Sequence, residues 1–263
     1  YKPPAFFIER TDLVFDLHEE KTIVTYELLF KKNKELDDDA LVLHGRDLVL
    51  ESLFLNKFRL TPADYVEDNE TLTIPNLSAI LETNSDQFTM TCVTRIEPQK
   101  NMSLEGLYKS NDKFCTQCEA EGFRKITYYL DRPDVMSSFT TKIIADKKKY
   151  PVLLSNGNKI DEGIVDGDIA RHWVSWEDPF KKPSYLFALV AGNLVSFEDQ
   201  FVTCSGRAIK LQIFVESKDI KKCDHAMQSL KNAMRWDEEV YGREYDLDIF
   251  MIVAVDDFNM GAM

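Results

Sequence analysis

The stretch Asp-Leu-Val-Phe-Asp-Leu at residues 12–17 sets the fold class of this chain. Its residues Leu13, Phe15 and Leu17 place an apolar side chain at every second position. Side chains along a β-strand point alternately to opposite faces, so a period of two predicts a strand with one buried face. The same period recurs along most of the first 192 residues and predicts an all-β domain over residues 1–192. We expect further strands at residues 22–30, 48–55, 71–74, 88–96, 125–130, 139–145, 172–176 and 185–191.

A different pattern follows Gly192. Residues 197–202 and 208–215 still resemble strands, residues 219–241 form the one long helical pattern, and residues 247–255 form an apolar strand. Asp219 is the expected N-cap of the helix, and Gly242 stands where a left-handed residue would end it. We therefore expect a second domain over residues 193–263, left unfinished at its end. The apolar stripe of the expected helix consists of Met227, Leu230, Met234 and Tyr241.

The composition is typical of a globular protein, with 263 residues of which 44% are hydrophobic and 29% are charged. The formal net charge of −13 argues against nucleic acid as a partner, because binding to a phosphate backbone depends on Lys and Arg that displace counterions. An acidic surface favours cationic substrates weakly, and a solubilising role is the simpler explanation. The sequence contains no apolar run of about 18 residues, so we expect no membrane segment in it.

The five cysteines are an odd number and sparse for the length, which favours a reducing compartment and a cytoplasmic location. The pair Cys115-x-x-Cys118 is compatible with half of a zinc site, with a redox pair or with ordinary thiols. Ordinary thiols are favoured, because no second cysteine pair or nearby histidine follows at ligand spacing. The histidines are scattered and predict no zinc site in this chain; they are His18, His44, His172 and His225.

A dense polar and aromatic stretch, residues 115–133, lies between strand-like runs and contains Gln117, Glu119 and Glu121. Loops held on a rigid scaffold are where binding residues concentrate, but a solvated acidic turn gives the same composition. From the residues alone, the solvated turn is favoured. The tripeptide that starts at Asp131 and ends at Pro133 is likewise expected to be an ordinary turn.

Five blocks of sequence resemble the aminopeptidase N family of the bacterial type, zinc aminopeptidases with a thermolysin-like catalytic domain. The resemblance implies an N-terminal domain like a β-sheet or β-sandwich, followed by the first strand-helix-strand portion of the α+β catalytic domain. The blocks are LEGLYKS (104–110), CTQCEAEGFRKITYYLDRPD (115–134), FTTKIIADKKKYPVLLSNGN (139–158), YLFALVAGNL (185–194) and SLKNAMRWDEEVYGREYDLDIFMIVAVDDFNMGAM (229–263).

In that family, the motif Gly-Ala-Met-Glu-Asn lines the substrate cleft. Gly261, Ala262 and Met263 match its first three positions, so the chain is expected to be a fragment that ends inside the motif. Small residues let the backbone of an extended substrate approach closely. Met260 precedes the motif, and the resemblance implies that it forms an adaptable wall of the pocket for the first substrate side chain.

The resemblance also implies an anchor for the free amino group of a peptide substrate. Glu119 matches the glutamate of the family's N-terminal domain that holds this α-ammonium group together with the motif's own glutamate. Gln117 matches a neighbouring polar side chain of the same pocket. An α-amino group has a reference pKa of about 7.7–8.0 and is largely protonated at neutral pH, so a carboxylate favours peptides with a free N-terminus.

The family's zinc ligands and catalytic residues, which include a His-Glu-x-x-His helix, are expected beyond Met263. The resemblance therefore implies a zinc-dependent aminopeptidase as the parent enzyme, and no catalytic residue, no metal site and no activity in this chain alone. The alternative is a non-catalytic β-rich protein-interaction module. A carbohydrate-binding β-sandwich ranks last, because the tryptophans are expected to face the core; they are Trp173, Trp176 and Trp236.

Overall fold

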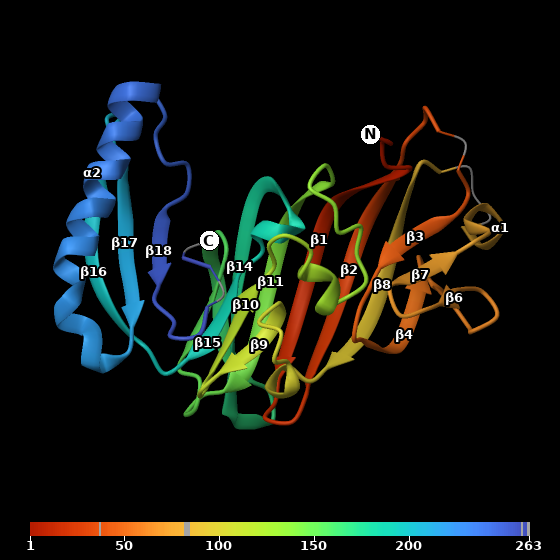
Figure 1. The fold of residues 1–263 in the computed structure, drawn as a ribbon, viewed down its shortest axis with the longest axis horizontal. Helices are drawn as coiled ribbons and strands as arrows, with labels where there is room; N and C mark the ends of the chain where they lie inside the picture. Colours follow the sequence, from red (N-terminus) through yellow and green to blue (C-terminus); the bar gives the residue numbers. More distant parts are fainter. Residues whose placement is uncertain (37, 82–84, 259, 262–263) are drawn as a thin grey trace.

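The computed structural model describes the whole chain except residues 37, 82–84, 259, 262 and 263. The protein is mainly β, as the alternating pattern predicts, and its described strands form four sheets (Figure 1). The largest sheet occupies the middle of the molecule, and α2 (Cys223–Tyr241) lies at one end of it with a small sheet of its own. The C-terminal segment returns from that small sheet toward the middle of the molecule.

The largest sheet has eight strands among the described residues, in the order β13-β14-β11-β1-β2-β8-β4-β5. Its central strand β1 pairs in parallel with β11 and in an antiparallel manner with β2. The stretch at residues 12–17 lies in β1, where Leu13, Phe15 and Leu17 are all buried, as its period predicts. The strands are β1 (Phe6–Leu17), β2 (Thr22–Lys32), β4 (Val49–Leu55), β5 (Phe58–Arg59), β8 (Gln87–Ile96), β11 (Met136–Asp146), β13 (Asn158–Val165) and β14 (Asp168–Pro183).

Two smaller sheets share one hydrophobic core with the large sheet. In that core, the ring of Phe15 in β1 stacks on Phe187, with ring centroids 5.7 Å apart. One smaller sheet has the order β12-β15-β10-β9 and the other β3-β7-β6. Their strands are β3 (Leu41–His44), β6 (Val66–Glu67), β7 (Thr71–Ile74), β9 (Gly106–Ser110), β10 (Lys113–Gln117), β12 (Val152–Ser155) and β15 (Leu189–Gly192); α1 (Leu77–Leu81) follows β7.

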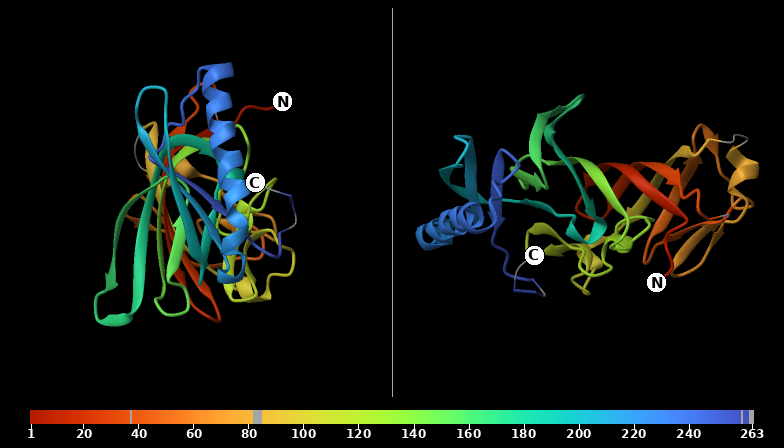
Figure 2. Two further views of the ribbon diagram at one scale, coloured as in Figure 1. Left: turned by 90° about the vertical axis from the view of Figure 1, so that its left-hand side faces the viewer. Right: turned by 90° about the horizontal axis from the view of Figure 1, so that it is seen from above.

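The remaining sheet, β16-β17-β18, is covered on both faces. It consists of β16 (Val195–Val202), β17 (Ala208–Val215) and β18 (Ile249–Val253). Alternate residues of β17 face α2, which runs alongside the sheet in Figure 2, whereas Phe214 points the other way into the first core. The second core, between this sheet and α2, contains Phe201, Ile209, Leu211, Ile213, Val215, Cys223, Met227, Leu230 and Met234.

Of the two predicted ends of the long helix, the C-terminal one is confirmed and the N-terminal one is wrong. Gly242 adopts the left-handed conformation with φ 60° and ends α2, as expected. Asp219 is not its N-cap, because residues 217–222 form a 3₁₀ turn and α2 begins only at Cys223. No helix among the described residues combines the length and apolar character needed to cross a membrane.

Four other expectations are wrong. Tyr241, expected on the apolar stripe of the helix, is 63% exposed, whereas Met227, Leu230 and Met234 are buried. Residues 125–130 do not form a strand, because a 3₁₀ turn, Phe123–Lys125, precedes a single bridge between Tyr129 and His44. The expected strand at 185–191 is a 3₁₀ turn followed by the shorter β15. Trp236 is 52% exposed on α2, so this tryptophan does not face the core.

Candidate functional site

The candidate site is built on the β9–β10 hairpin. In its register Ser110 pairs with Lys113, Tyr108 with Cys115, and Gly106 with Gln117. Since side chains alternate along a strand, these residues share one face of the hairpin. The sequence pattern missed both strands because every residue of β10 is buried, which removes the alternation of polar and apolar positions. Gln117 therefore ends a strand, where a loop was expected.

This face of the hairpin contacts the C-terminal part of the chain. The Gln117 amide donates a hydrogen bond to the thioether of Met260, which lies 143 positions later in the sequence. The Tyr108 hydroxyl donates to the backbone carbonyl of Asp257 at 2.7 Å. Both predicted residues, Gln117 and Met260, are thus brought together by tertiary structure.

Gln117 also organises the turn that carries Glu119. Its side-chain carbonyl accepts a hydrogen bond from the Glu119 backbone N–H at 2.5 Å, and its side chain is fully buried. The peptide bond between Glu119 and Ala120 is cis. The Glu119 side chain is exposed, and its carboxylate forms no ion pair with any described residue. A buried amide therefore holds the backbone beneath an exposed carboxylate that is free to bind a cation.

A glycine closes this turn. The Gly122 N–H donates to the carbonyl of Cys118 at 2.8 Å. A Cβ at Gly122 would lie 2.6 Å from the backbone oxygen of Gln117 and 2.8 Å from the backbone nitrogen of Gly106. Only glycine allows the turn to lie this close to the end of the hairpin.

A buried ion pair between Arg124 and Asp131 lies next to the turn that carries Glu119. Asp131, expected to belong to an ordinary turn, is 4% exposed and accepts hydrogen bonds from the backbone N–H and the guanidinium of Arg124 at 3.2 and 3.0 Å. The hydroxyl of Ser184 donates to the other carboxylate oxygen at 2.5 Å. The side chain of Glu121 is 67% exposed and pairs with the Arg124 guanidinium at 3.3 Å, which fits its expected place in a solvated turn. Asp131 is thus a supporting residue that sequence reasoning missed.

The cysteines of this region do not provide a reactive pair. All five cysteines of the chain are free thiols. Burial raises the pKa of the Cys115 thiol to about 12 and the pKa of the Cys118 thiol well above its usual value. Both thiols stay protonated at neutral pH, and the thiolate is the form that attacks disulfides or binds metals. The ordinary-thiol interpretation of the Cys-x-x-Cys pair is therefore the one that the structure supports.

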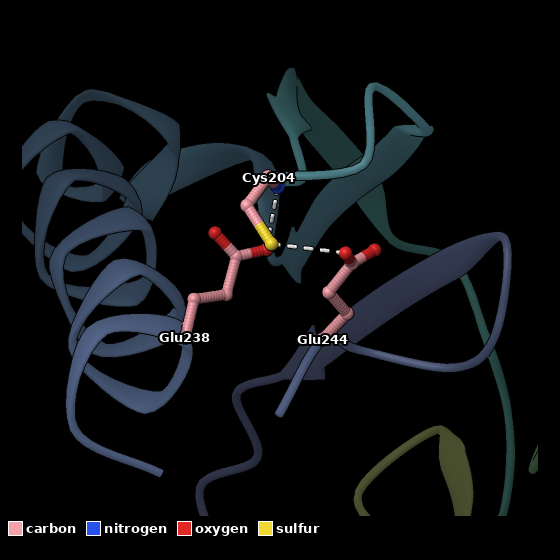
Figure 3. Close-up of side chains that lie close together, drawn as sticks. All are labelled: Cys204, Glu238 and Glu244. Atoms are coloured by element: carbon pink, nitrogen blue, oxygen red, sulfur yellow. Dashed lines mark hydrogen bonds between the residues drawn. The ribbon is translucent and has the colours of Figure 1, made fainter. Parts of the chain in front are cut away.

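Among the described residues, one group of three potential metal ligands lies close together: Cys204, Glu238 and Glu244, whose ligand atoms lie within 4.8 Å of one another (Figure 3). Hydrogen bonds already engage these groups, since the Cys204 thiol donates to Glu244 at 2.9 Å and the Ser205 hydroxyl donates to Glu244 at 2.6 Å. These bonds lower the pKa of Glu244 to about 2, and the same thiol–carboxylate bond raises the pKa of Cys204. The group contains no histidine and stabilises the β16–β17 turn, so it does not fit the zinc site that the resemblance implies.

The remaining predicted site residues lie at the C-terminal end. Met260 is 38% exposed, and Gly261 is exposed, so that a Cβ at this glycine would meet no atom within 4 Å. Ala262 and Met263 lie outside the described residues. The described part of the site thus comprises Gln117, Glu119, Met260 and Gly261.

The comparisons with known proteins identify the family of the chain. Residues 10–186 match the peptidase M1 N-terminal domain. The chain is 51% identical over 263 residues to aminopeptidase N of Escherichia coli (strain K12), and 50% identical over 263 residues to aminopeptidase N of Caulobacter vibrioides. Each alignment covers 100% of this chain and 29% of the relative, so the chain spans less than a third of the length of these curated relatives.

A solved structure shows the same fold. The crystal structure of Legionella pneumophila aminopeptidase A in complex with aspartic acid superposes with a TM-score of 0.92 at 35% sequence identity, and the match covers 99% of this chain and 30% of that one. Because the family match spans residues 10–186 and the identity to the bacterial enzymes extends along the whole chain, the chain belongs to the aminopeptidase N family of M1 peptidases.

Proposed function

We propose that this chain is the N-terminal part of a zinc metallo-aminopeptidase that releases N-terminal amino acids from peptides, and that it supplies the groups that anchor the substrate. The observation that carries this proposal is the contact between Gln117 and Met260, which places the Glu119 turn beside the C-terminal segment. The names of the relatives support the reaction class.

In the proposed complex, the Glu119 carboxylate accepts hydrogen bonds from the α-ammonium group of the peptide. A charge-assisted hydrogen bond is stronger than a neutral one, and a blocked or internal amide nitrogen offers no such charge. Gln117 holds the backbone of Glu119 through the 2.5 Å hydrogen bond and lines the same pocket. Met260 and Gly261 are proposed to form the opposite wall, along which the substrate backbone would lie; Ala262 and Met263 lie outside the described residues and are assigned to this wall by the sequence resemblance alone.

The described residues offer no zinc site of the family's kind, so no catalytic step is assigned to this chain. Zinc is proposed to bind to the part of the full-length protein that follows Met263. Residues 1–192 would then form the N-terminal domain, and residues 193–263 would begin the catalytic domain. The five free thiols support a reducing, cytoplasmic location for the enzyme.

The test is a kinetic comparison in the full-length enzyme. Hydrogen bonds to charged groups contribute about 1.5–3 kcal/mol, so Glu119→Ala is expected to raise KM for a free-amine aminoacyl substrate about ten- to a hundredfold. Glu121→Ala is the matched control, because Glu121 lies in the same turn but pairs with Arg124. An unchanged KM in Glu119→Ala would remove Glu119 from the site, and turnover of an N-acetylated substrate would contradict the proposed exopeptidase.

A further inference from the structure

The segment that follows β18 contacts the β9–β10 hairpin at Met260, through Gln117, and also at Asp257. Two side chains of β9 hold Asp257 at once. The Tyr108 hydroxyl donates to its backbone carbonyl, and the Ser110 hydroxyl donates to its carboxylate, both at 2.7 Å. Tyr108 and Ser110 are 0% and 2% exposed, whereas the Asp257 side chain is exposed. The donors therefore belong to the rigid hairpin and the acceptors to the segment that it holds.

The two hydrogen bonds differ in what they require. Any residue at position 257 offers a carbonyl to Tyr108, but only a side chain with a short polar acceptor reaches Ser110. The carboxylate contact is charge-assisted and accordingly stronger than a neutral hydrogen bond. The side chain of Asp257 therefore adds an attachment that the backbone alone does not provide.

The geometry of the hairpin links this attachment to the candidate site. Tyr108, Ser110 and Gln117 lie on the same face, and Gln117 contacts Met260, which is three residues after Asp257. Three residues span at most about 10–11 Å of extended chain, so a fixed Asp257 limits where Met260 and Gly261 can lie.

We propose that Asp257 is a positioning residue for the substrate site. Its hydrogen bond with Ser110 holds Met260 and Gly261 in place opposite Gln117 and Glu119. This inference rests on the proposed function. Asp257 touches neither substrate nor metal in this assignment. It acts through the segment that it anchors, so its loss affects the binding of substrate more than turnover.

The test uses the full-length protein with two variants of Asp257 and one neighbouring control. Asp257→Ala removes the acceptor, whereas Asp257→Asn keeps an oxygen that can accept from Ser110. Asp256→Ala is the control, because Asp256 is also exposed and its one ion pair among the described residues is a 3.9 Å contact with Lys218. KM and kcat are measured with a free-amine aminoacyl substrate, and hydrogen exchange is measured for the peptide that covers residues 254–261.

We expect Asp257→Ala to raise KM about three- to tenfold with kcat within about twofold, which is less than the full contribution of a charge-assisted hydrogen bond because Asp257 acts only through the segment. Exchange at residues 254–261 should become faster in the same variant. Asp257→Asn and Asp256→Ala should stay within about twofold of the parent enzyme in KM. Ser110→Ala removes the same bond from the other side, and combining it with Asp257→Ala should add no further increase.

Unchanged hydrogen exchange at residues 254–261 in Asp257→Ala would overturn the proposal. An Asp257→Asn variant whose KM rises as much as that of Asp257→Ala would also overturn it. The outcome for the proposed function is separate. If Glu119→Ala leaves KM unchanged, the anchoring role of Glu119 fails, while the exchange measurement still decides whether Asp257 fixes the segment. If Glu119→Ala raises KM and Asp257→Ala does not, the proposed anchoring of the substrate by Glu119 is supported and the positioning role of Asp257 is refuted.

Discussion

The Nζ atom of Lys113 lies 2.5 Å from Oε1 of Glu216, and this ion pair joins the β9–β10 hairpin to the end of β17. The Lys113 side chain is 2% exposed and passes over Gly192, where a Cβ would lie 2.7 Å from its Cγ. Lys218 contacts the second carboxylate oxygen of Glu216 at 2.7 Å. The buried cation at the junction of two sheets therefore has Glu216 as its nearer acidic partner, while the more exposed Asp112 lies 3.5 Å away.

The Lys113–Glu216 pair makes stability depend on pH in the acid range. Hydrogen bonds from Lys113 and Lys218 lower the pKa of Glu216 from 4.5 to about 2 in the folded chain. The unfolded chain binds this proton first as the pH falls, so the stabilisation is complete above about pH 4.5 and is lost as the pH falls toward 2. Urea unfolding should show that Glu216→Gln has a lower free energy of unfolding than the parent. The difference between the two proteins should be large at pH 7 and should become smaller below pH 4.5. Glu162→Gln, which breaks an exposed pair with Lys159, is the control and should show a small difference throughout. A constant difference for Glu216→Gln would contradict the assignment.

The Arg124–Asp131 pair should be among the costliest contacts to break. Both side chains are nearly buried, at 9% and 1% exposure, and Asp131→Asn removes the buried counterion of the guanidinium and leaves it the exposed Glu121 at 3.3 Å. Removing one partner of a buried pair costs about 3–5 kcal/mol. Asp134→Asn is the matched control, because its pair with Arg132 is partly exposed and should be worth about 0–1 kcal/mol. Denaturant unfolding measures the free energy of unfolding of both variants. An equal decrease in the two variants would show that burial does not make the Arg124 pair costlier to break.

Gly122→Ala should disrupt the turn that carries Glu119. The added methyl would lie 2.6 Å from a backbone oxygen, which cannot move aside as a flexible side chain can. Overpacking of this kind costs about 1–3 kcal/mol. Gly261→Ala, where a Cβ meets nothing within 4 Å, should change the free energy of unfolding by less than about 0.5 kcal/mol. If thermal unfolding gave the same result for the two variants, the close approach at Gly122 would not be a real constraint.

The 263-residue chain on its own should neither retain stoichiometric zinc nor hydrolyse peptides. Its one described group of three potential ligands, Cys204, Glu238 and Glu244, lacks a histidine and is engaged in hydrogen bonds. Elemental analysis after dialysis against zinc, and assays with an aminoacyl chromogenic substrate, check both points against the full-length enzyme. Reproducible turnover above a contaminant control would refute this expectation. Cys204→Ser should leave the zinc content of the full-length enzyme unchanged.

The site was predictable from sequence only in part. The resemblance to the aminopeptidase N family is what predicts Gln117, Glu119 and Met260 as site residues, because their residue types alone fit a solvated turn and an ordinary loop. Asp257 and Asp131 carried no such signal. Their roles depend on partners far away in the sequence, since Asp257 meets Ser110 at a separation of 147 positions and Asp131 meets Ser184 at a separation of 53.

Strands with one buried face, such as β1 and β7, follow from the sequence alone, as does the glycine that ends α2. These features are local, because alternation and a left-handed residue are visible within a few positions. The strand character of β9 and β10, the first residue of α2 and the contacts of Gln117 and Lys113 depend on tertiary packing. A strand buried on both faces shows no alternation, and contacts between distant segments follow from how the sheets pack.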